Sequence, residues 1–458
     1  MGALTRRLRR TWRAWTTPEP PAPPPRDEPG EAVSAEALDL VLRVGELLLT
    51  SGESTERVTE SMFGLAVAYE LPRCEVQVTL TSLVVSAHPG NGRPPVTGSR
   101  AIRRRTPAYW RLTALHQLVQ EASLGLLEPA AAHRRLAEIE RAPAPYPRWL
   151  LVAAFGLIAA SASVLSGGGA LAASTAFGAT VLGDRAAAVL ARRGVAEFYQ
   201  LALAAAIATA AAALVVAVGT PARASTVVTG AILALLPGRP LVASIQDGIT
   251  GDLISATARL MEVFFIIAGI VAGVGLVVYT AVRLDFPIDM TQLPSSPPAL
   301  DPVQVLAAAG VSVAFAVSLA APRGTVLPAL LGGALIWVLF VLLRAQDVPP
   351  VLASAVAATA LSVPANLYAD RRRAPVQPYM VPIIGPLLPG GMLYQGMVEL
   401  NSGSPQSGLL SLIGALSVAL ALAAGVNLGG ELVRAFRRFG LSASGRWARP
   451  AARRTRGF

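Results

Sequence analysis

Apolar residues follow two different patterns along this 458-residue chain. Within residues 31–147 they recur at helical or alternating spacing among polar residues, as in a soluble domain. After residue 148 they form successive runs of roughly 20 residues, the length that a helix needs to cross a bilayer. The pattern therefore predicts a small soluble front domain followed by a polytopic α-helical membrane protein.

The front domain, residues 31–147, is predicted to be α+β. Helices are expected near 34–50, from a cap at Ser54 or Thr55 onward, near 108–124 and near 128–140. The alternating stretch 74–87 is typical of one strand, and Asn91-Gly92 predicts a hairpin turn into a second, basic strand.

Ten apolar runs follow, and we read them as two units of five. They cover 149–166, 168–184, 197–219, 225–244, 254–282, 303–320, 325–344, 349–369, 376–400 and 407–433. The second run is rich in glycine, serine and threonine, so it is expected to line the interior of the bundle rather than face lipid. The resulting domains are a first half, 148–283, and a second half, 303–433.

Arginines support this count of ten. With the front domain placed in the cytoplasm, 18 of the 21 arginines after residue 147 fall on the inner side and three, Arg223, Arg283 and Arg344, on the outer side. This distribution satisfies the positive-inside rule, and both termini are then cytoplasmic. The protein is expected in a bacterial inner membrane as a multi-pass protein.

Composition narrows the function classes. The chain is 53% hydrophobic and 15% charged, which is too apolar for an ordinary soluble protein. Its net charge of +11 comes from arginines that flank apolar runs, so membrane orientation explains it and a nucleic-acid partner is not expected. Cys74 is the single cysteine, and no metal site or cofactor is expected.

The two ends of the chain are basic. Residues 1–30 combine an arginine-rich stretch, which is either a short amphipathic helix on an anionic membrane surface or a basic tail, with a proline-rich linker. Residues 434–458 form a basic cytoplasmic tail. Oligomerisation is left open by the sequence.

The tetrapeptide Leu-Leu-Pro-Gly occurs twice inside apolar runs, at 235–238 and at 387–390. Proline and glycine both interrupt a helix, and here they do so in the fourth and ninth of ten runs. Because five is odd, the second unit enters the membrane from the opposite side. Interrupted helices at matching positions of two inverted repeats indicate the site of a secondary transporter.

At this point the chain resembles the threonine/serine exporter family (ThrE-type), in its fused two-half form with an N-terminal cytoplasmic domain. The resemblance rests on "GESTERVTESM" (52–62), "LLPGRPLVASIQDGITGDLISATARLMEV" (235–263) and "VPIIGPLLPGGMLYQGMVEL" (381–400). It implies a transporter rather than an enzyme, which exports small amino acids; export of a small dicarboxylate such as succinate is the alternative. The family positions that match here are Gly52, Thr55, Glu56, Arg57, Pro237, Gly238, Asp247, Gly251, Asp252, Glu262, Pro389 and Gly390.

A zwitterionic substrate needs one partner for its carboxylate and another for its ammonium group. Broken helices can offer freed amides to the first and freed carbonyls to the second. The polar side chains that could complete such a site are Gln246, Asp247, Gln395, Glu399 and Asn401. Asp247 and Asp252 fit either the transport path or a cytoplasmic loop.

Glu262 is the sharpest candidate for proton coupling, with Asp252 as the second. Glu262 lies within the fifth apolar run, where an ionised carboxylate is costly unless it is paired or faces water. All three histidines lie before residue 148, so a proton relay in the membrane must use carboxylates. The alternative is a structural ion pair of Glu262 with Arg259.

Two hypotheses of another class remain. Asp184 and Asp252 each follow a glycine, as in intramembrane aspartyl proteases, but the fuller Gly-x-Gly-Asp pattern is missing. A membrane-anchored hydrolase could use Thr55, Ser82, His88 and His116 of the front domain, but no nucleophile elbow or metal-ligand spacing accompanies them.

Overall fold

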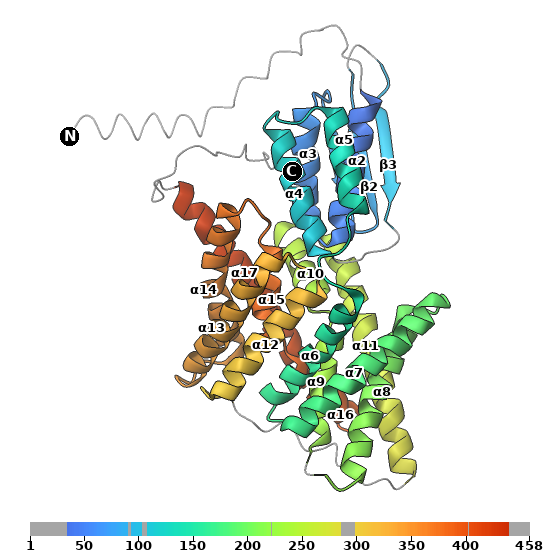
Figure 1. Cartoon of the computed structure of the whole chain (residues 1–458), viewed down its shortest axis with the longest axis vertical. Helices are drawn as coiled ribbons and strands as arrows, with labels where there is room; N and C mark the ends of the chain where they lie inside the picture. Colours follow the sequence, from blue (N-terminus) through green and yellow to red (C-terminus); the bar gives the residue numbers. More distant parts are fainter. Residues whose placement is uncertain are drawn as a thin grey trace, which may run out of the picture.

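The computed structural model describes residues 34–89, 93–102, 108–220, 222–284, 298–401 and 403–438. It has a mixed α/β front domain and a larger helical part, which lies below the front domain in Figure 1. The N-terminal tail and linker, the Asn91-Gly92 turn and most of the basic C-terminal tail lie outside the described residues.

The front domain confirms the predicted helices. Its described elements are α2 (Ala35–Ser51), α3 (Thr55–Ala68), β1 (Glu75–Val78), β2 (Ser82–Ala87), β3 (Val96–Ala101), α4 (Tyr109–Ser123) and α5 (Pro129–Arg141). Ser34 Oγ accepts the Ala37 amide at 3.2 Å and so begins α2. Gly52 ends α2 at φ 102°, a left-handed conformation that favours glycine, and the chain turns directly into α3. Ser54 occupies the cap position of α3, but its side chain makes no capping hydrogen bond.

The stretch 74–87 was wrongly predicted as one strand. It forms β1 and β2, which pair antiparallel, and β2 pairs with β3 in the same way. The turn between β1 and β2 is closed by Thr79, whose amide donates to the Ser82 carbonyl at 2.9 Å. The residues of this turn continue the alternation of the strands, so the pattern alone did not indicate where the chain reverses.

The helical part follows the ten apolar runs, but two of them are broken. Its first half contains α6 (Arg148–Leu165), α7 (Ala170–Arg192), α8 (Glu197–Ala217), α9 (Ala224–Leu235), α10 (Gly238–Thr250) and α11 (Leu253–Arg283). Its second half contains α12 (Pro302–Ser318), the 3-10 turn η1 (Arg323–Thr325), α13 (Val326–Arg344), α14 (Pro350–Arg371), α15 (Gln377–Ile384), the 3-10 turn η2 (Gly385–Leu387), α16 (Gly390–Asn401) and α17 (Pro405–Arg438).

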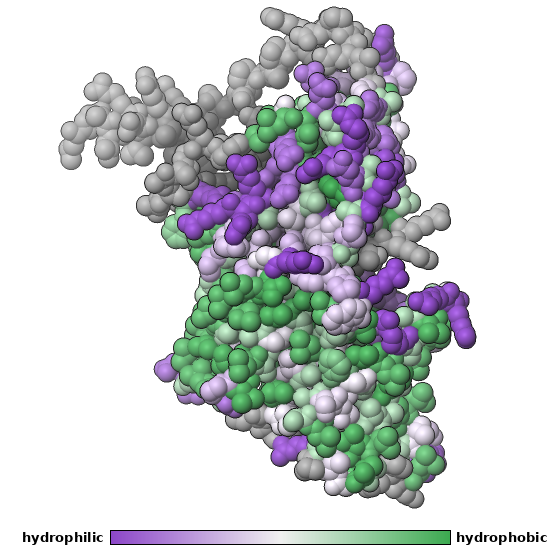
Figure 2. Space-filling model, viewed as in Figure 1, coloured by the Kyte–Doolittle hydropathy of each residue, from purple (hydrophilic) through white to green (hydrophobic). Residues whose placement is uncertain are grey.

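The helical part carries a broad apolar surface. Figure 2 shows it below the polar front domain, as expected for a region surrounded by lipid. Among the described residues, six helices are long and apolar enough to cross a membrane, and a seventh span results if α9 and α10 are joined. The structure therefore supports a polytopic helical membrane protein, but these criteria do not yield ten spans. The α12 helix has only 17 residues, and the broken run of α15 and α16 has pieces of 8 and 12.

The expectation that the second run lines the interior is only half right. Small residues of α7, such as Ala176 and Gly183, are buried against the bundle. Its larger apolar side chains, Leu171, Phe177 and Leu182, are exposed. One side of α7 thus packs on the bundle through small residues, and the other side is exposed. The small residues lower the mean hydropathy of this run because they allow close helix packing, and the helix as a whole is not buried.

Glycines bring several helices into backbone contact. An added Cβ at Gly273 of α11 would overlap the Ala202 carbonyl oxygen of α8, and one at Gly425 of α17 would overlap the Ala355 carbonyl oxygen of α14. Membrane helices commonly pack closely through glycine. The hydrophobic effect does not drive helices together in lipid, because lipid is as apolar as their side chains, so close van der Waals contact has to hold them together. The third helix of each half thus packs on the last helix of the same half.

Candidate functional site

The first Leu-Leu-Pro-Gly sequence divides one apolar run into α9 and α10, which meet at a bend of 51°. The Gly238 amide donates to the Leu236 carbonyl at 2.8 Å, and the Leu241 amide donates to the Pro237 carbonyl at 3.0 Å. Pro237 and Gly238 are both buried. Proline cannot donate a backbone hydrogen bond, so the helix stops before Pro237 and starts again with Gly238.

The second Leu-Leu-Pro-Gly sequence repeats this geometry between η2 and α16. The Gly390 amide donates to the Leu388 carbonyl at 2.8 Å, and the Leu393 amide donates to the Pro389 carbonyl at 3.1 Å. Pro389 and Gly390 are also buried. The same four residues therefore produce the same break in both halves.

The two breaks lie against each other at the contact between the halves. A Cβ added at Gly238 would lie 2.7 Å from Leu388 Cδ1, and one added at Gly390 would lie 3.0 Å from Leu233 Cδ1. Each glycine thus faces a leucine beside the other break. The structure brings together two positions that are 152 residues apart in the sequence, and it buries both within the same apolar core.

The polar candidates beyond the breaks form separate groups. Gln246 of α10 donates to Asn427 Oδ1 of α17 at 3.0 Å. On the other side, Gln395 donates to Glu399 Oε1 at 2.9 Å, and Ser411 Oγ donates to Glu399 Oε2 at 2.7 Å. Gln246 therefore links the two halves, whereas Glu399 joins α16 to α17 through Ser411.

Asp247 forms a buried ion pair with Arg259. Arg259 Nε donates to Asp247 Oδ2 at 2.8 Å, and the two side chains are 4% and 0% exposed. Thr55 of the front domain donates its hydroxyl to Asp247 Oδ1 at 3.2 Å. Sequence reasoning singled out Thr55 and Asp247 separately, and the structure places them in direct contact across 192 residues.

Glu53 connects the front domain to both halves of the helical part. Its backbone carbonyl accepts a hydrogen bond of 3.4 Å from Arg259 Nη2 of α11. Its side-chain Oε1 accepts a hydrogen bond from Gln377 Nε2 of α15. Burial raises the pKa of the Glu53 carboxyl, and nearby Arg57 opposes this shift.

The other family positions have mixed placements. Gly52 caps α2 and directs the chain into Glu53 and Thr55, whereas Glu56 and Arg57 lie half-buried in the first turn of α3. Asp252 caps α11 by accepting the Ser255 amide at 3.1 Å. Glu262 is half-buried on α11, while the guanidinium of Arg259 is directed to Asp247.

Four residues of these groups were not predicted as site residues: Glu53, Gln377, Ser411 and Asn427. Glu53 lies inside the motif that carries the family resemblance, so its position was a usable signal. Ser411 lies 12 residues after Glu399, as Arg259 lies 12 after Asp247, and this equal spacing was also readable. Gln377 and Asn427 have no local signal, because their contacts span 324 and 181 residues.

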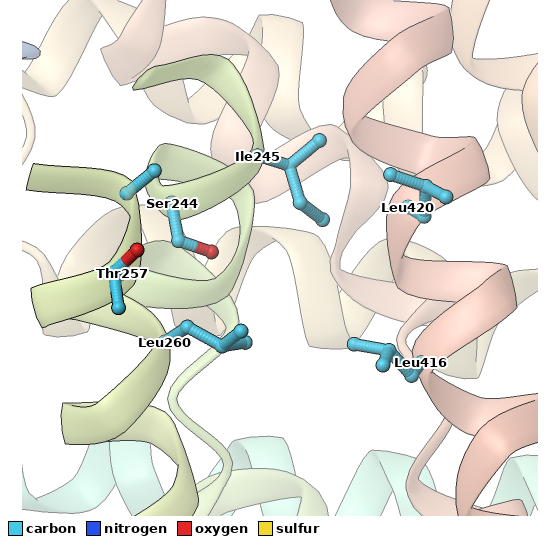
Figure 3. A pocket seen from close by; sticks show the side chains of 7 residues that line it. Ser244, Ile245, Thr257, Leu260, Leu416 and Leu420 are labelled. Atoms are coloured by element: carbon cyan, nitrogen blue, oxygen red, sulfur yellow. The ribbon is translucent and has the colours of Figure 1, made fainter. Parts of the chain in front are cut away.

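A pocket of about 260 Å³ opens beside the α10–α11 corner (Figure 3). Leu416 and Leu420 of α17 face Ile245 and Leu260 across it. Ser244 Oγ also lines the pocket, but it already donates to the Leu241 carbonyl at 2.8 Å. The pocket is therefore an apolar cleft between the halves, with little polar capacity for a zwitterion.

The geometry gives no support to the enzyme hypotheses. Asp184 pairs with the neighbouring Arg185 at 2.8 Å at an exposed position, whereas Asp252 caps a helix. In the front domain, Thr55 is bound to Asp247 and Ser82 Oγ lies 2.9 Å from Thr79 Oγ1. Within the described ranges, no group of three histidine, cysteine, aspartate or glutamate residues could hold a metal ion.

Comparisons with known proteins match most of the chain. A family model described as "Putative threonine/serine exporter" matches residues 39–281, and one described as "Threonine/Serine exporter, ThrE" matches residues 304–430. The chain is 34% identical over 401 residues to the "Probable threonine/serine exporter" of Mycobacterium tuberculosis, and the matched region covers 86% of this chain and 75% of that protein. It is 31% identical over 437 residues to the "Threonine/serine exporter" of Corynebacterium glutamicum, and here the matched region covers 93% of this chain and 88% of that protein. No solved structure matches it significantly. The chain therefore belongs to the threonine/serine exporter family.

Proposed function

We propose that this protein is a secondary transporter that exports threonine and serine across the cytoplasmic membrane and is driven by the proton gradient. The two relatives carry the name of exporters of these amino acids. The observation that carries the proposal is the contact between the two buried Leu-Leu-Pro-Gly breaks. Paired broken helices at the contact between two halves are the arrangement from which many secondary transporters build a substrate site.

We further propose that the halves are inverted repeats of five transmembrane segments each. The supporting contacts recur at an offset of 152 residues. The Asp252 amide donates to the Asp247 carbonyl at 2.9 Å, and the Ser404 amide donates to the Glu399 carbonyl at 3.0 Å. The preceding glycines, 251 and 403, both adopt a left-handed conformation, with φ of 94° and 83°.

The packing of the last helix of each half supports the same repeat. Gly273 and Gly425 are also 152 residues apart, and each contacts the sixth residue of the third helix of its own half, Ala202 or Ala355. Because each unit has an odd number of segments, the second is inverted with respect to the first. The arginine distribution supports a cytoplasmic front domain and cytoplasmic termini.

In this proposal the breaks supply main-chain groups to the substrate. In this conformation the Gly238 and Gly390 amides and the Pro237 and Pro389 carbonyls are bonded within each break. They become available to the carboxylate and the ammonium group of the substrate when the breaks open. Gln246, Asp247, Gln395 and Glu399 follow the breaks within α10 and α16, where their side chains can complete the site when the halves separate. The side chain of Asn401 lies outside the described part of the structure.

Proton coupling is assigned to Glu262, with Asp252 as the second candidate. Arg259 neutralises Asp247, so Asp247 is not assigned this role. Glu262 is a half-buried carboxylate within the apolar helix α11, where taking up a proton would lower the cost of its charge. Glu262→Gln should retain exchange of threonine but lose efflux driven by an imposed proton gradient. Gradient-driven efflux at the wild-type rate would rule out this role.

The test of the function is efflux of labelled threonine, serine and succinate from proteoliposomes, with and without a proton gradient. Threonine and serine should leave the vesicles faster than succinate. Pro237→Ala and Pro389→Ala should both slow efflux while the proteins still purify as folded species. Absence of transport of all three compounds would refute the proposal, and preferential efflux of succinate would move it to a dicarboxylate exporter.

A further inference from the structure

The front domain contacts both halves of the membrane part at the same end. In Figure 1 it lies above α10 of the first half and α15 of the second. Helix α3 packs on α10, and α4 packs on α15. A domain fixed to both halves at one end would hold that end closed, so its contacts decide whether the halves can separate there.

The first-half contact is polar. It consists of the Thr55 hydroxyl on Asp247 and the Glu53 carbonyl on Arg259. Asp247 and Arg259 belong to α10 and α11, so both charges stay in the first half when the front domain leaves. Undocking therefore keeps the ion pair intact, and water can replace the two groups that are removed.

The second-half contact is largely apolar and backbone-mediated. Ala316 and Ala321, at the end of α12, and Ala329 of α13 belong to the same hydrophobic cluster as the front-domain core. The first amides of α4, those of Tyr109 and Trp110, donate to carbonyls at the end of α12 at 3.1 and 3.0 Å. Water cannot replace buried apolar area, and separation here would expose the core as well as unpaired helix ends.

The outer end of the protein offers an internal comparison. Glu399 and Ser411 lie 152 residues after Asp247 and Arg259, and they bond to each other at 2.7 Å within the second half. In Figure 1, α16 lies at the end of the helical part opposite the front domain. The cytoplasmic copy of this corner is thus the one that the front domain closes.

We propose that the front domain is the cytoplasmic gate of the transporter, and that it moves with the second half and detaches from the first at the Thr55–Asp247 contact. This inference rests on the proposed transport function, since it requires the halves to move against each other. In this gate, the Gly-Glu-Ser-Thr turn between α2 and α3 inserts Glu53 and Thr55 between the halves when the cytoplasmic side is closed.

Spin-label distances test this gate directly. In a Cys74→Ser background, Val67→Cys on exposed α3 is paired once with Arg192→Cys, at the end of α7, and once with Arg371→Cys, at the end of α14. With threonine present on both sides of nanodisc-embedded protein, the 67–192 distribution should gain a second population, while the 67–371 distribution should stay unchanged. A change confined to the 67–371 pair, or no change in either pair, would overturn the gate.

Transport by the same labelled proteins separates the two proposals. If they carry threonine in proteoliposomes and the front domain does not move, the gate is wrong and the transport function stands. If they carry neither threonine nor serine, the transport function itself fails, and the gate fails with it.

A reversible cross-link supplies a second measurement. Glu53→Cys with Gln377→Cys joins the front domain to the second half at side chains that are hydrogen-bonded in the structure. Oxidation should leave threonine transport at the rate of the reduced form, because this contact stays closed while the halves move. Loss of transport on oxidation would contradict the proposal.

Discussion

Two corners of the molecule have the same backbone but different chemistry. In the first half, α10 turns into α11 and Asp247 pairs with Arg259; in the second half, α16 turns into α17 and Glu399 bonds to Ser411. The first corner is closed by Thr55 of the front domain, and the second by groups of its own half. The two corners therefore differ in how they are closed: an ion pair lies beneath the front domain in the first half, and a hydrogen bond from a hydroxyl to a carboxylate lies at the second corner.

The largest expected effect comes from breaking the charged corner. Arg259→Ala leaves Asp247 buried without its counter-charge, which should cost about 3–5 kcal/mol. The matched change at the other corner, Ser411→Ala, removes one hydrogen bond and should cost about 1 kcal/mol. Thermal unfolding midpoints of both variants, measured in the same detergent, test the difference. Equal shifts would mean that the two corners contribute alike.

A double variant checks the cause of that cost. Asp247→Asn with Arg259→Gln removes both charges and leaves amides that can still bond, so it should unfold at a higher temperature than Arg259→Ala. If the double variant is the less stable of the two, the penalty does not come from an unpaired charge.

The close helix contacts should respond equally in the two halves. Gly273→Ala and Gly425→Ala each force a Cβ against a backbone carbonyl, so each should cost about 1–3 kcal/mol. Gly178→Ala in α7 is the control, because its Cβ would meet nothing within 4 Å. Strong destabilisation by one change and none by the other would argue against equivalent packing in the two halves.

Docking of the front domain should weaken as pH rises. Burial raises the pKa of Glu53 in the docked state, so docking favours the protonated carboxyl, although Arg57 opposes this effect. The stabilisation of the docked state is fully present below the ordinary pKa of glutamate. It is lost as the pH rises to the raised pKa of docked Glu53, and the docking equilibrium then changes by at most about tenfold per pH unit, because one proton is involved. Arg57, Glu60 and Gln377 act on this carboxyl and should modulate the dependence, while Arg259 contacts the Glu53 backbone carbonyl.

Glu53→Gln is the matched variant for this titration. It keeps a polar group opposite Gln377 and cannot ionise, so the docked population seen by the 67–192 spin labels should no longer depend on pH. A pH dependence that persists unchanged in Glu53→Gln would assign the titration to another group.

The smallest effect is expected at Thr55. Thr55→Val removes the hydroxyl bond to Asp247 and should weaken docking by about 1 kcal/mol, because undocking lets water satisfy the freed oxygen. Thr55→Ser keeps the hydroxyl and should dock like the wild type. The docked fraction from the 67–192 distances measures both variants, and equal docking by valine and serine would show that the hydroxyl is not used.

Much of the frame could be predicted from local pattern. The front-domain helices and the two breaks follow from periodicity and from proline, which act within a few residues. The turn between β1 and β2 was missed because Thr79 to Thr81 continues the alternation of the strands. The count of ten spans stays a prediction, because six or seven spans among the described helices meet the criteria of length and hydropathy.

The candidate site was predicted less well than the frame. Asp247 was singled out, but its partners Arg259 and Thr55 could not be assigned, because the first contact needs the α10–α11 turn and the second spans 192 residues. A pair of Glu262 with Arg259 was one alternative, and nothing in the sequence indicated that Arg259 Nε also donates to Asp247 Oδ2. A sequence determines which groups are costly to bury, but the fold decides which of them meet.

In the proposed transport cycle, the two contacting breaks form a site that opens to each side of the membrane in turn. Leu236→Cys and Leu388→Cys test this cycle in a Cys74→Ser background, because both leucines are buried and hold the same place in their Leu-Leu-Pro-Gly sequences. A membrane-impermeant thiol reagent should label each cysteine from either face, in right-side-out and in inside-out vesicles, at rates that threonine alters. Labelling from one face only, or from neither, would contradict the account.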